Sequence, residues 1–318
     1  MKNKQITKKS KILLVVPRYE LSVNKINYDY SFPMGLAYIS SSLKHAGYIV
    51  DALNLNHFGG RAKDIMHIFL NKTNYDFVLT GNDALGYNIT KIIIETAKEH
   101  PSKPKSILGG PIITSEPYLM FDDLGPDFGV IGEGEEVIVN LIDTVNSKKD
   151  LKKVSGVVFK EGEKTIMTEK GKPPVNLDEL PFPDFEGLGG EKWIKEMHPN
   201  TNYGYNSYDY PRVYPLVASR SCPYQCTFCY HDNNFYRARS MDNIMEEIKL
   251  VVEKYRVNTL IIQDEMFALH KDRVADFCNR LIALSNEMGT QIKWFAQMKV
   301  DRVDKDLLIK MKSAGCVK

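Results

Sequence analysis

Short apolar runs alternate with amphipathic segments along the first half of the chain, from about residue 11 to residue 146. In the amphipathic segments apolar residues recur every three or four positions, as Ile39, Leu43 and Ala46 do, which predicts helices. The strand candidates are Ile12–Val16, Tyr48–Leu55, Phe77–Thr80, Ser106–Leu108 and Phe128–Ile131, and two of the helix candidates are Gly35–Ala46 and Asn88–Glu99. Such alternation predicts an α/β fold with a parallel sheet, and five strands favour the flavodoxin-like (Rossmann-like) order.

The alternation of strands and helices returns after residue 211. The run Val213–Ala218 predicts a buried strand, and Ser240 is a good N-cap for a helix whose apolar residues repeat at three and four up to Tyr255. The later candidates are strands at Thr259–Ile262 and Ile292–Met298, helices through Val274–Leu281 and Leu307–Met311, and a further strand beginning at Cys316. These are three β-α units of a parallel barrel and the start of a fourth. Because a half-barrel leaves one strand edge open, we expect a fragment or truncated product of a longer enzyme, unless a partner completes the barrel.

The segment between the two halves has a different composition. Val154–Lys160 and Lys164–Thr168 alternate like a hairpin, and several prolines without helical periodicity follow them, which is typical of a surface connector. We therefore expect three segments, with boundaries at 1–150, 151–210 and 211–318. Four tyrosines between Tyr203 and Tyr210 are expected to anchor the connector to the last segment.

Small residues gather where the first-half strands end. In a parallel sheet these carboxyl ends share one edge, where ligands bind, and small residues let a bulky, flat ligand approach the backbone. The candidate ligand-binding residues at this edge are Gly35, Thr80, Gly81, Gly109, Gly110, Gly132, Glu133 and Gly134. Taken singly, such glycines more often only make tight turns. The phosphate-binding G-x4-G-K-[ST] and dinucleotide-binding G-x-G-x-x-G patterns are absent, which disfavours nucleotide hydrolysis and an ordinary nicotinamide site.

Three of the five cysteines, Cys222, Cys226 and Cys229, follow the predicted strand at Val213–Ala218 with the spacing C-x3-C-x2-C. Three thiolates on one short loop form a soft, sulfur-rich metal site that leaves one coordination position open. The other two, Cys278 and Cys316, are interpreted as small buried hydrophobes. An odd, clustered set does not resemble a secreted disulfide framework, so we expect a cytoplasmic protein.

The net charge and the length of the chain indicate which kinds of partner and how many domains to expect. The 42 basic and 40 acidic side chains give a formal charge of +2, so no global electrostatic attraction to nucleic acid or anionic membrane is expected. The apolar run Ile12–Val16 near the N-terminus is too short for a signal peptide or a membrane span. A chain of 318 residues is expected to contain two domains.

The cysteine loop, with Phe228 just before its last cysteine, resembles the signature loop of radical S-adenosylmethionine (SAM) enzymes. The order of N-terminal motifs is similar to the cobalamin-binding domain that precedes the partial (β/α) TIM-type barrel in one large subgroup of that family. The motifs are Pro33-x-Gly35-Leu36, Gly109-Gly110-Pro111 and Gly132-Glu-Gly-Glu135. The resemblance covers roughly residues 11 to 318.

The resemblance implies that Cys222, Cys226 and Cys229 hold a [4Fe–4S] cluster whose fourth iron binds SAM. Reductive cleavage of SAM then gives methionine and a 5′-deoxyadenosyl radical that abstracts hydrogen from a substrate. It also implies an electron donor such as flavodoxin or ferredoxin. The substrate would be a small molecule or natural product, with no nucleic acid or membrane involved.

The same resemblance assigns four residues to SAM. Phe228 and Tyr230 would lie near the adenine. Asp264 and Glu265 end the second barrel strand, where the wider family carries a Gly-Gly-Glu motif that faces the methionine amino group. This chain keeps the acidic character but lacks the two glycines.

For the N-terminal domain, the resemblance implies bound cobalamin. Many such domains ligate cobalt with a histidine in the loop after the first strand, but the loop Pro17–Gly35 contains none, and His57 does not occupy the equivalent place. The pattern therefore implies cobalt without a histidine ligand below it, or loss of cobalamin binding, of which we favour the former. Cobalamin suggests methyl transfer to an unactivated carbon or phosphorus centre, and rearrangement or cyclisation stays open.

Three competing interpretations are considered, of which the second fails. Cys222, Cys226, Cys229 and His231 could form a Cys3His zinc site. A methylthiotransferase would need further cysteines in the N-terminal domain, and none precedes Cys222. The third is an inactive truncation product, and we expect the chain as given to have little or no activity.

Overall fold

The computed structural model describes residues 10–18, 30–196, 211–230, 232–233 and 235–317. The chain divides into two compact units. Unit 1 comprises residues 1–174 and 180–190, and unit 2 comprises residues 175–179 and 191–318. The tyrosines between Tyr203 and Tyr210, and also His231, lie outside the described residues.

Unit 1 is built on a seven-stranded sheet with the order β2-β1-β3-β4-β5-β6-β7. The strands are β1 Lys11–Val16, β2 Ile49–Asn54, β3 Phe77–Gly81, β4 Lys105–Gly109, β5 Phe128–Val130, β6 Val157–Glu161 and β7 Lys164–Met167. The first five are parallel to one another, with Leu14 beside Ala52 on one side and Leu79 on the other. The parallel sheet and the flavodoxin-like order expected for them are confirmed.

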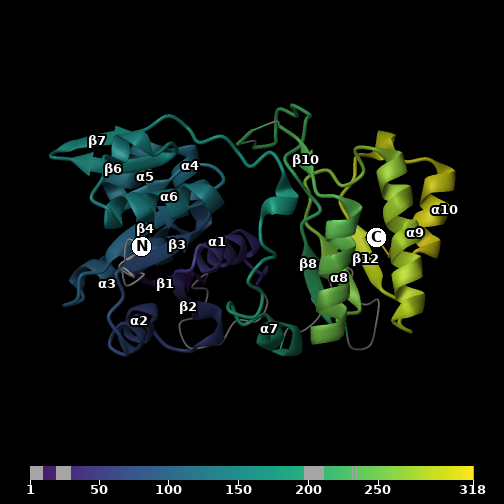
Figure 1. Cartoon of the computed structure of the whole chain (residues 1–318), viewed down its shortest axis with the longest axis horizontal. Coiled ribbons are helices and arrows are strands. Elements are labelled where there is room, and N and C mark those ends of the chain that lie inside the picture. Colours follow the sequence, from purple (N-terminus) through teal and green to yellow (C-terminus); the bar gives the residue numbers. More distant parts are fainter. Residues whose placement is uncertain (1–9, 19–29, 197–210, 231, 234, 318) are drawn as a thin grey trace, which may run out of the picture. The chain divides into compact units, whose positions relative to one another are not determined.

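The hairpin β6–β7 lies at one edge of this sheet (Figure 1). It pairs antiparallel to β5, with Phe128 opposite Phe159. Val157, Val158 and Phe159 are buried because they continue the sheet's apolar layer. The hairpin is confirmed, and the structure places it in unit 1 rather than in a connector, since strand pairing at a sheet edge depends on contacts that local composition does not reveal.

Helices cover the sheet of unit 1. They are α1 Met34–His45, α2 Ala62–Leu70, α3 Tyr87–Glu99, α4 Pro111–Ser115, α5 Pro117–Leu124 and α6 Glu135–Asn146. Helices α2 and α3 pack their apolar faces, including Met66 and Ile93, onto Leu13 and Val15 of β1. Helices α1 and α6 contact each other. The helical spacing at three and four in the sequence is the origin of this packing.

Unit 2 contains a parallel three-stranded sheet of order β12-β11-β8, formed by β8 Val213–Leu216, β11 Thr259–Ile262 and β12 Lys293–Ala296. Its helices are α8 Met241–Tyr255, α9 Lys271–Glu287 and α10 Lys305–Ser313, and α9 packs against both of the others (Figure 1). Ser240 caps α8 by accepting a hydrogen bond from the Asn243 N–H at 3.1 Å, as expected. Cys316 forms a parallel bridge with Trp294, so the fourth strand begins where predicted.

The remaining elements are short. They are the helix α7 Gly190–Glu196 and the two-stranded antiparallel ribbon of β9 Ser219–Arg220 and β10 Arg237–Ala238. Among the described residues, none of the helices combines the length and the apolar character needed to span a lipid bilayer.

Candidate functional site

The three clustered cysteines lie on a loop that is closed at its base. The loop leaves the carboxyl end of β8, passes through β9, carries Cys222, Cys226 and Cys229, and returns through β10. Arg220 and Arg237 pair across the ribbon. Because the ribbon joins the two ends of the loop, all three cysteines lie on one closed loop at the carboxyl ends of the strands.

The thiols of this loop are available to a metal. None of the three cysteines forms a disulfide; Cys222 and Cys226 are half-buried and Cys229 is exposed. Across the described ranges, no three His, Cys, Asp or Glu side chains converge tightly enough to hold a single metal ion. A cubane cluster does not require that convergence, because each thiolate ligates a different iron. Three free thiolates on one loop therefore fit an iron–sulfur cluster.

A strained turn precedes the first cysteine. Ser221 has a φ of +66°, in the left-handed region that non-glycine residues rarely adopt. Its hydroxyl donates a hydrogen bond to Asn233 Oδ1 at 2.9 Å and accepts one from the Arg237 guanidinium at 3.2 Å. Arg237 is buried. These contacts compensate the backbone strain and set the direction in which the chain enters Cys222.

Two aromatic side chains beside the last cysteine face solvent. Phe228 is 88% exposed and Tyr230 is 59% exposed, unusual values for large aromatic residues. Burial and the nearby Asp232 carboxylate raise the pKa of Tyr230. The exposed rings provide surfaces on which a flat ligand group can stack.

Another aromatic residue of the loop was missed in the sequence. Tyr224, between the first two cysteines, lies under two cations from the loop that follows β12. Lys299 Nζ is 4.4 Å from the centre of its ring, and the Arg302 guanidinium carbon is 5.4 Å away. These cation–π contacts hold the outer part of the cysteine loop. No local signal could reveal them, because the partners are more than seventy residues apart.

The two acidic residues after β11 have opposite environments. Asp264 is only 2% exposed, whereas Glu265 is exposed. They continue the alternation of the strand, in which Leu260 and Ile262 are buried. Burial raises the pKa of Asp264 to about 6, and hydrogen bonds from Ser219 and Ala218 oppose that shift. Period-two alternation in the sequence was the signal that could have separated these two carboxylates.

At the carboxyl edge of the sheet in unit 1, the glycines fall into two groups. A Cβ on Gly110, whose φ is +87°, would lie 2.8 Å from the Asn82 carbonyl oxygen, so this glycine is required by the fold itself. Gly81 and Gly134 are also closely packed. Gly35 and Gly109, by contrast, have nothing within 4 Å of a Cβ position. Two of the predicted positions thus leave open space in which a ligand can approach the backbone, and this fits a flat cofactor.

Some of the other predicted residues at this edge already form hydrogen bonds within the protein. Thr80 is buried and its hydroxyl donates to the Val15 carbonyl at 3.0 Å. Gly132 has a φ of +79°, and its N–H donates to Thr114 Oγ1 at 3.1 Å. Glu133 is half-buried. The hydroxyl and carboxylate oxygens can still accept hydrogen bonds from a ligand.

His57 lies at the end of β2, in a buried polar cluster of unit 1. Its Nε2 is 2.8 Å from Tyr30 Oη, and the Asn54 side-chain amide donates to the same hydroxyl at 2.7 Å. Only a glycine fits beside the ring, because a Cβ on Gly189 would lie 2.6 Å from the imidazole. His57 is therefore part of the internal packing of the edge.

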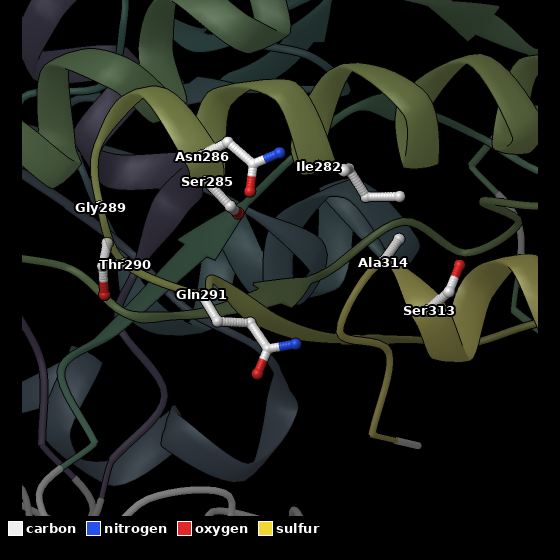
Figure 2. A pocket seen from close by; sticks show the side chains of 8 residues that line it. All are labelled: Ile282, Ser285, Asn286, Gly289, Thr290, Gln291, Ser313 and Ala314. Carbon is white, nitrogen blue, oxygen red and sulfur yellow. The ribbon is translucent and has the colours of Figure 1, made fainter.

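A cavity of about 340 Å³ lies elsewhere, at the opposite end of the sheet in unit 2. Figure 2 shows its lining side chains at the end of α9, in the turn before β12 and at the end of α10. They are Ile282, Ser285, Asn286, Gly289, Thr290, Gln291, Ser313 and Ala314. None of the predicted site residues is among them. The predicted site is therefore identified by the chemistry of its residues and not by this cavity.

Residues 22–142 match a family model described as the B12 binding domain. An uncharacterized methyltransferase of Pyrococcus horikoshii is 28% identical over 315 residues, covering 96% of this chain and 63% of the relative. The anaerobic magnesium-protoporphyrin IX monomethyl ester cyclase of Cereibacter sphaeroides is 27% identical over 322 residues, covering 96% of this chain and 49% of the relative. The chain thus spans about half to two thirds of the length of these curated relatives.

Among solved structures, the fold is similar to that of the radical SAM methyltransferase TsrM from Kitasatospora setae, which was determined with tryptophan substrate and a SAM analogue bound. The TM-score is 0.74 at 13% sequence identity, and the match covers 97% of this chain and 58% of the other. The structural similarity thus extends over both units of the chain.

Proposed function

Because the chain belongs to the radical SAM enzymes that carry a B12-binding domain, we propose that it holds a [4Fe–4S] cluster, SAM and cobalamin and transfers a methyl group to an unactivated centre of a small molecule. The observation that carries the proposal is the cysteine loop. Cys222, Cys226 and Cys229 are free and accessible on one loop at the carboxyl edge of a parallel sheet. That edge is where βα folds of this kind bind their ligands.

Cys222, Cys226 and Cys229 would hold the cluster, and SAM would bind to it through its amino and carboxylate groups. When bound, the cluster and SAM supply radical chemistry, and cobalamin supplies a methyl carrier. The exposed rings of Phe228 and Tyr230 stack with the adenine. Exposed Glu265 offers a carboxylate to the methionine ammonium group.

Cobalamin binds at the carboxyl edge of the sheet in unit 1. The open backbone at Gly35 and Gly109 admits its flat ring. Thr80 and Glu133 accept hydrogen bonds from its amide groups, and Gly81, Gly110, Gly132 and Gly134 shape the turns that bear this surface. His57 is held by Tyr30 and contributes no cobalt ligand.

A second function within the same chemistry is cyclisation or rearrangement without methyl transfer. The observation that favours it is the similarity to a cyclase, at an identity close to that of the methyltransferase relative. In both cases an electron donor such as flavodoxin or ferredoxin reduces the cluster, and the reaction takes place in the cytoplasm without nucleic acid.

The test begins with anaerobic reconstitution of the chain with iron and sulfide. We expect about four irons per chain and a broad visible absorption. Cys222→Ala, Cys226→Ala and Cys229→Ala should each lose most of the bound iron, while Cys278→Ala, a buried cysteine in α9, serves as the matched control. A colourless protein with one zinc per chain would contradict the proposal.

Product analysis then separates the two reactions. The reconstituted protein is incubated with a strong reductant, SAM and cobalamin, at a protein concentration high enough to detect the low activity expected of the chain as given, and nucleoside products are measured. Methyl transfer predicts S-adenosylhomocysteine together with 5′-deoxyadenosine, whereas cyclisation or rearrangement predicts 5′-deoxyadenosine alone. Cobalamin retention after gel filtration, measured from its absorption spectrum, tests unit 1 separately.

A further inference from the structure

We propose that Asp264 is a positioning residue that clamps the stem of the cysteine loop and does not contact SAM. The inference deepens the proposed function, since it assigns the two adjacent carboxylates after β11 to different tasks. Asp264 holds the chain that delivers Cys222, and Glu265 remains as the accessible acid of the site.

Both oxygens of the Asp264 carboxylate are already used. Oδ1 accepts the Ala218 backbone N–H at 2.7 Å, and Oδ2 accepts the Ser219 hydroxyl at 2.5 Å. The residue is 2% exposed. A carboxylate committed in this way is not directed at a ligand in the open site, and its two bonds join β11 to the segment that follows β8.

The backbone of Ala218 is also held at its carbonyl group. Its carbonyl oxygen accepts a hydrogen bond from the Arg273 guanidinium at 3.1 Å and one from the Arg239 N–H at 3.0 Å. Arg273 comes from α9 and Arg239 from the returning end of the loop. The backbone of this one residue is thus fixed by three separate parts of the chain, and Asp264 is the partner of its N–H.

The two charged side chains of the clamp have opposite signs, and each acts on the pKa of the other against the effect of burial. Burial lowers the pKa of Arg273, and the Tyr236 and Asp264 side chains act against that shift. Arg273 in turn acts against the burial that raises the pKa of Asp264. A buried carboxylate with a nearby cation and two short hydrogen bonds is stable in one orientation, which is the property a positioning group requires.

The clamp acts on Cys222 more directly than on the other cysteines. Only Arg220 and Ser221 separate the Ser219 hydroxyl bond from Cys222, and Ser221 is the strained residue of the turn. Cys226 lies four residues further along the loop. Release of the stem should therefore change the environment of Cys222 first.

The experiment compares Asp264→Asn and Ser219→Ala with Glu265→Gln, all in the full chain. In the metal-free protein, alkylation of each cysteine is followed by mass spectrometry, and amide hydrogen exchange is followed over residues 217–222. After reconstitution, loss of iron to a chelator and the affinity of the loaded protein for SAM are measured.

For Asp264→Asn we expect alkylation of Cys222 to accelerate several-fold while Cys229 is unchanged, and iron loss to be roughly tenfold faster, as for other residues that orient metal ligands. SAM affinity per loaded cluster should equal that of the wild type. Ser219→Ala should shift the same readouts in the same direction by less. Glu265→Gln should retain iron like the wild type and bind SAM more weakly.

The opposite pattern overturns the proposal. If Asp264→Asn keeps iron and normal Cys222 alkylation but weakens SAM binding, then Asp264 is a ligand contact. If Asp264→Asn does not fold, Ser219→Ala decides between the same outcomes. If even the wild type binds no cluster, the proposed function fails, whereas alkylation and hydrogen exchange in the metal-free chain still decide the clamp.

Discussion

The two parallel sheets present their carboxyl edges in different ways. In unit 1 the edge is made of small residues and bare backbone, with open space above Gly35 and Gly109. In unit 2 the buried Asp264 and the half-buried Arg273 fix the stem of a loop that carries three free thiols. The same β-α architecture thus leaves open space at the edge where we propose that cobalamin binds, and it holds the loop on which we propose that the cluster binds.

Because of this difference, we expect mutations at the two edges to destabilise the protein for different physical reasons. Where the edge is made of backbone, a substitution acts mainly through volume and φ. Where it is made of buried charges, a substitution that removes one partner leaves the other uncompensated. Three predictions test the contrast.

The largest effect is expected for the buried ion pair between Arg239 and Glu247, whose side chains are 4% and 1% exposed. Tyr214 also donates to Glu247, at 2.5 Å. Glu247→Gln keeps the size of the side chain but leaves the arginine charge uncompensated, so the free energy of unfolding should fall by roughly 3–5 kcal/mol. Urea denaturation measures it. The exposed neighbour Glu246 is the control. Equal effects of Glu246→Gln and Glu247→Gln would contradict a buried charge network.

The second prediction concerns pH. Burial raises the pKa of Asp264 from 3.8 to about 6, so the folded state binds this proton more tightly than the unfolded state. The stability that this group contributes is therefore full below about pH 3.8 and is lost as the pH rises through about 6, by up to about 3 kcal/mol. The difference in unfolding free energy between wild type and Asp264→Asn should decrease over that range. A difference that does not change with pH would show that the carboxylate titrates normally.

The smallest effect separates two neighbouring glycines of unit 1. Gly110→Ala places a Cβ against the Asn82 backbone at a positive φ and should cost roughly 1–3 kcal/mol. Gly109→Ala meets nothing and should change stability by less than about 0.5 kcal/mol. Thermal unfolding of both variants measures the contrast. Gly109→Leu should instead weaken cobalamin retention without loss of stability, and unchanged retention would argue against a ligand above Gly109.

Much of the fold could be predicted because it depends on local patterns. Apolar runs and three-four spacing located β1 to β5 and the helix capped by Ser240. The spacing C-x3-C-x2-C pointed to the cysteine loop without any structural information. Each of these signals lies within one continuous stretch of the chain.

The rest depends on partners distant in sequence. The hairpin β6–β7 was placed in a connector because its pairing with β5 cannot be read from composition. The residue types alone do not distinguish Asp264 from Glu265, although only Asp264 is buried in the fold. The cations that lie over Tyr224 come from the loop after β12, which is distant in sequence. Such contacts arise from tertiary packing, which local propensity does not encode.

The division of the chain into units has a consequence for how the protein is made. Because residues 175–179 belong to unit 2 and residues 180–190 to unit 1, the backbone passes between the units three times. The small segment 175–179 is synthesised before unit 1 is complete, yet its Asp178 accepts the Ser240 N–H, at 2.9 Å and a separation of 62 residues. Because domains fold in the order of synthesis, unit 1 can be completed only after residues 175–179 have been made, and these residues must then wait for the rest of unit 2. Cutting the gene at any single codon would therefore leave one of the two units incomplete.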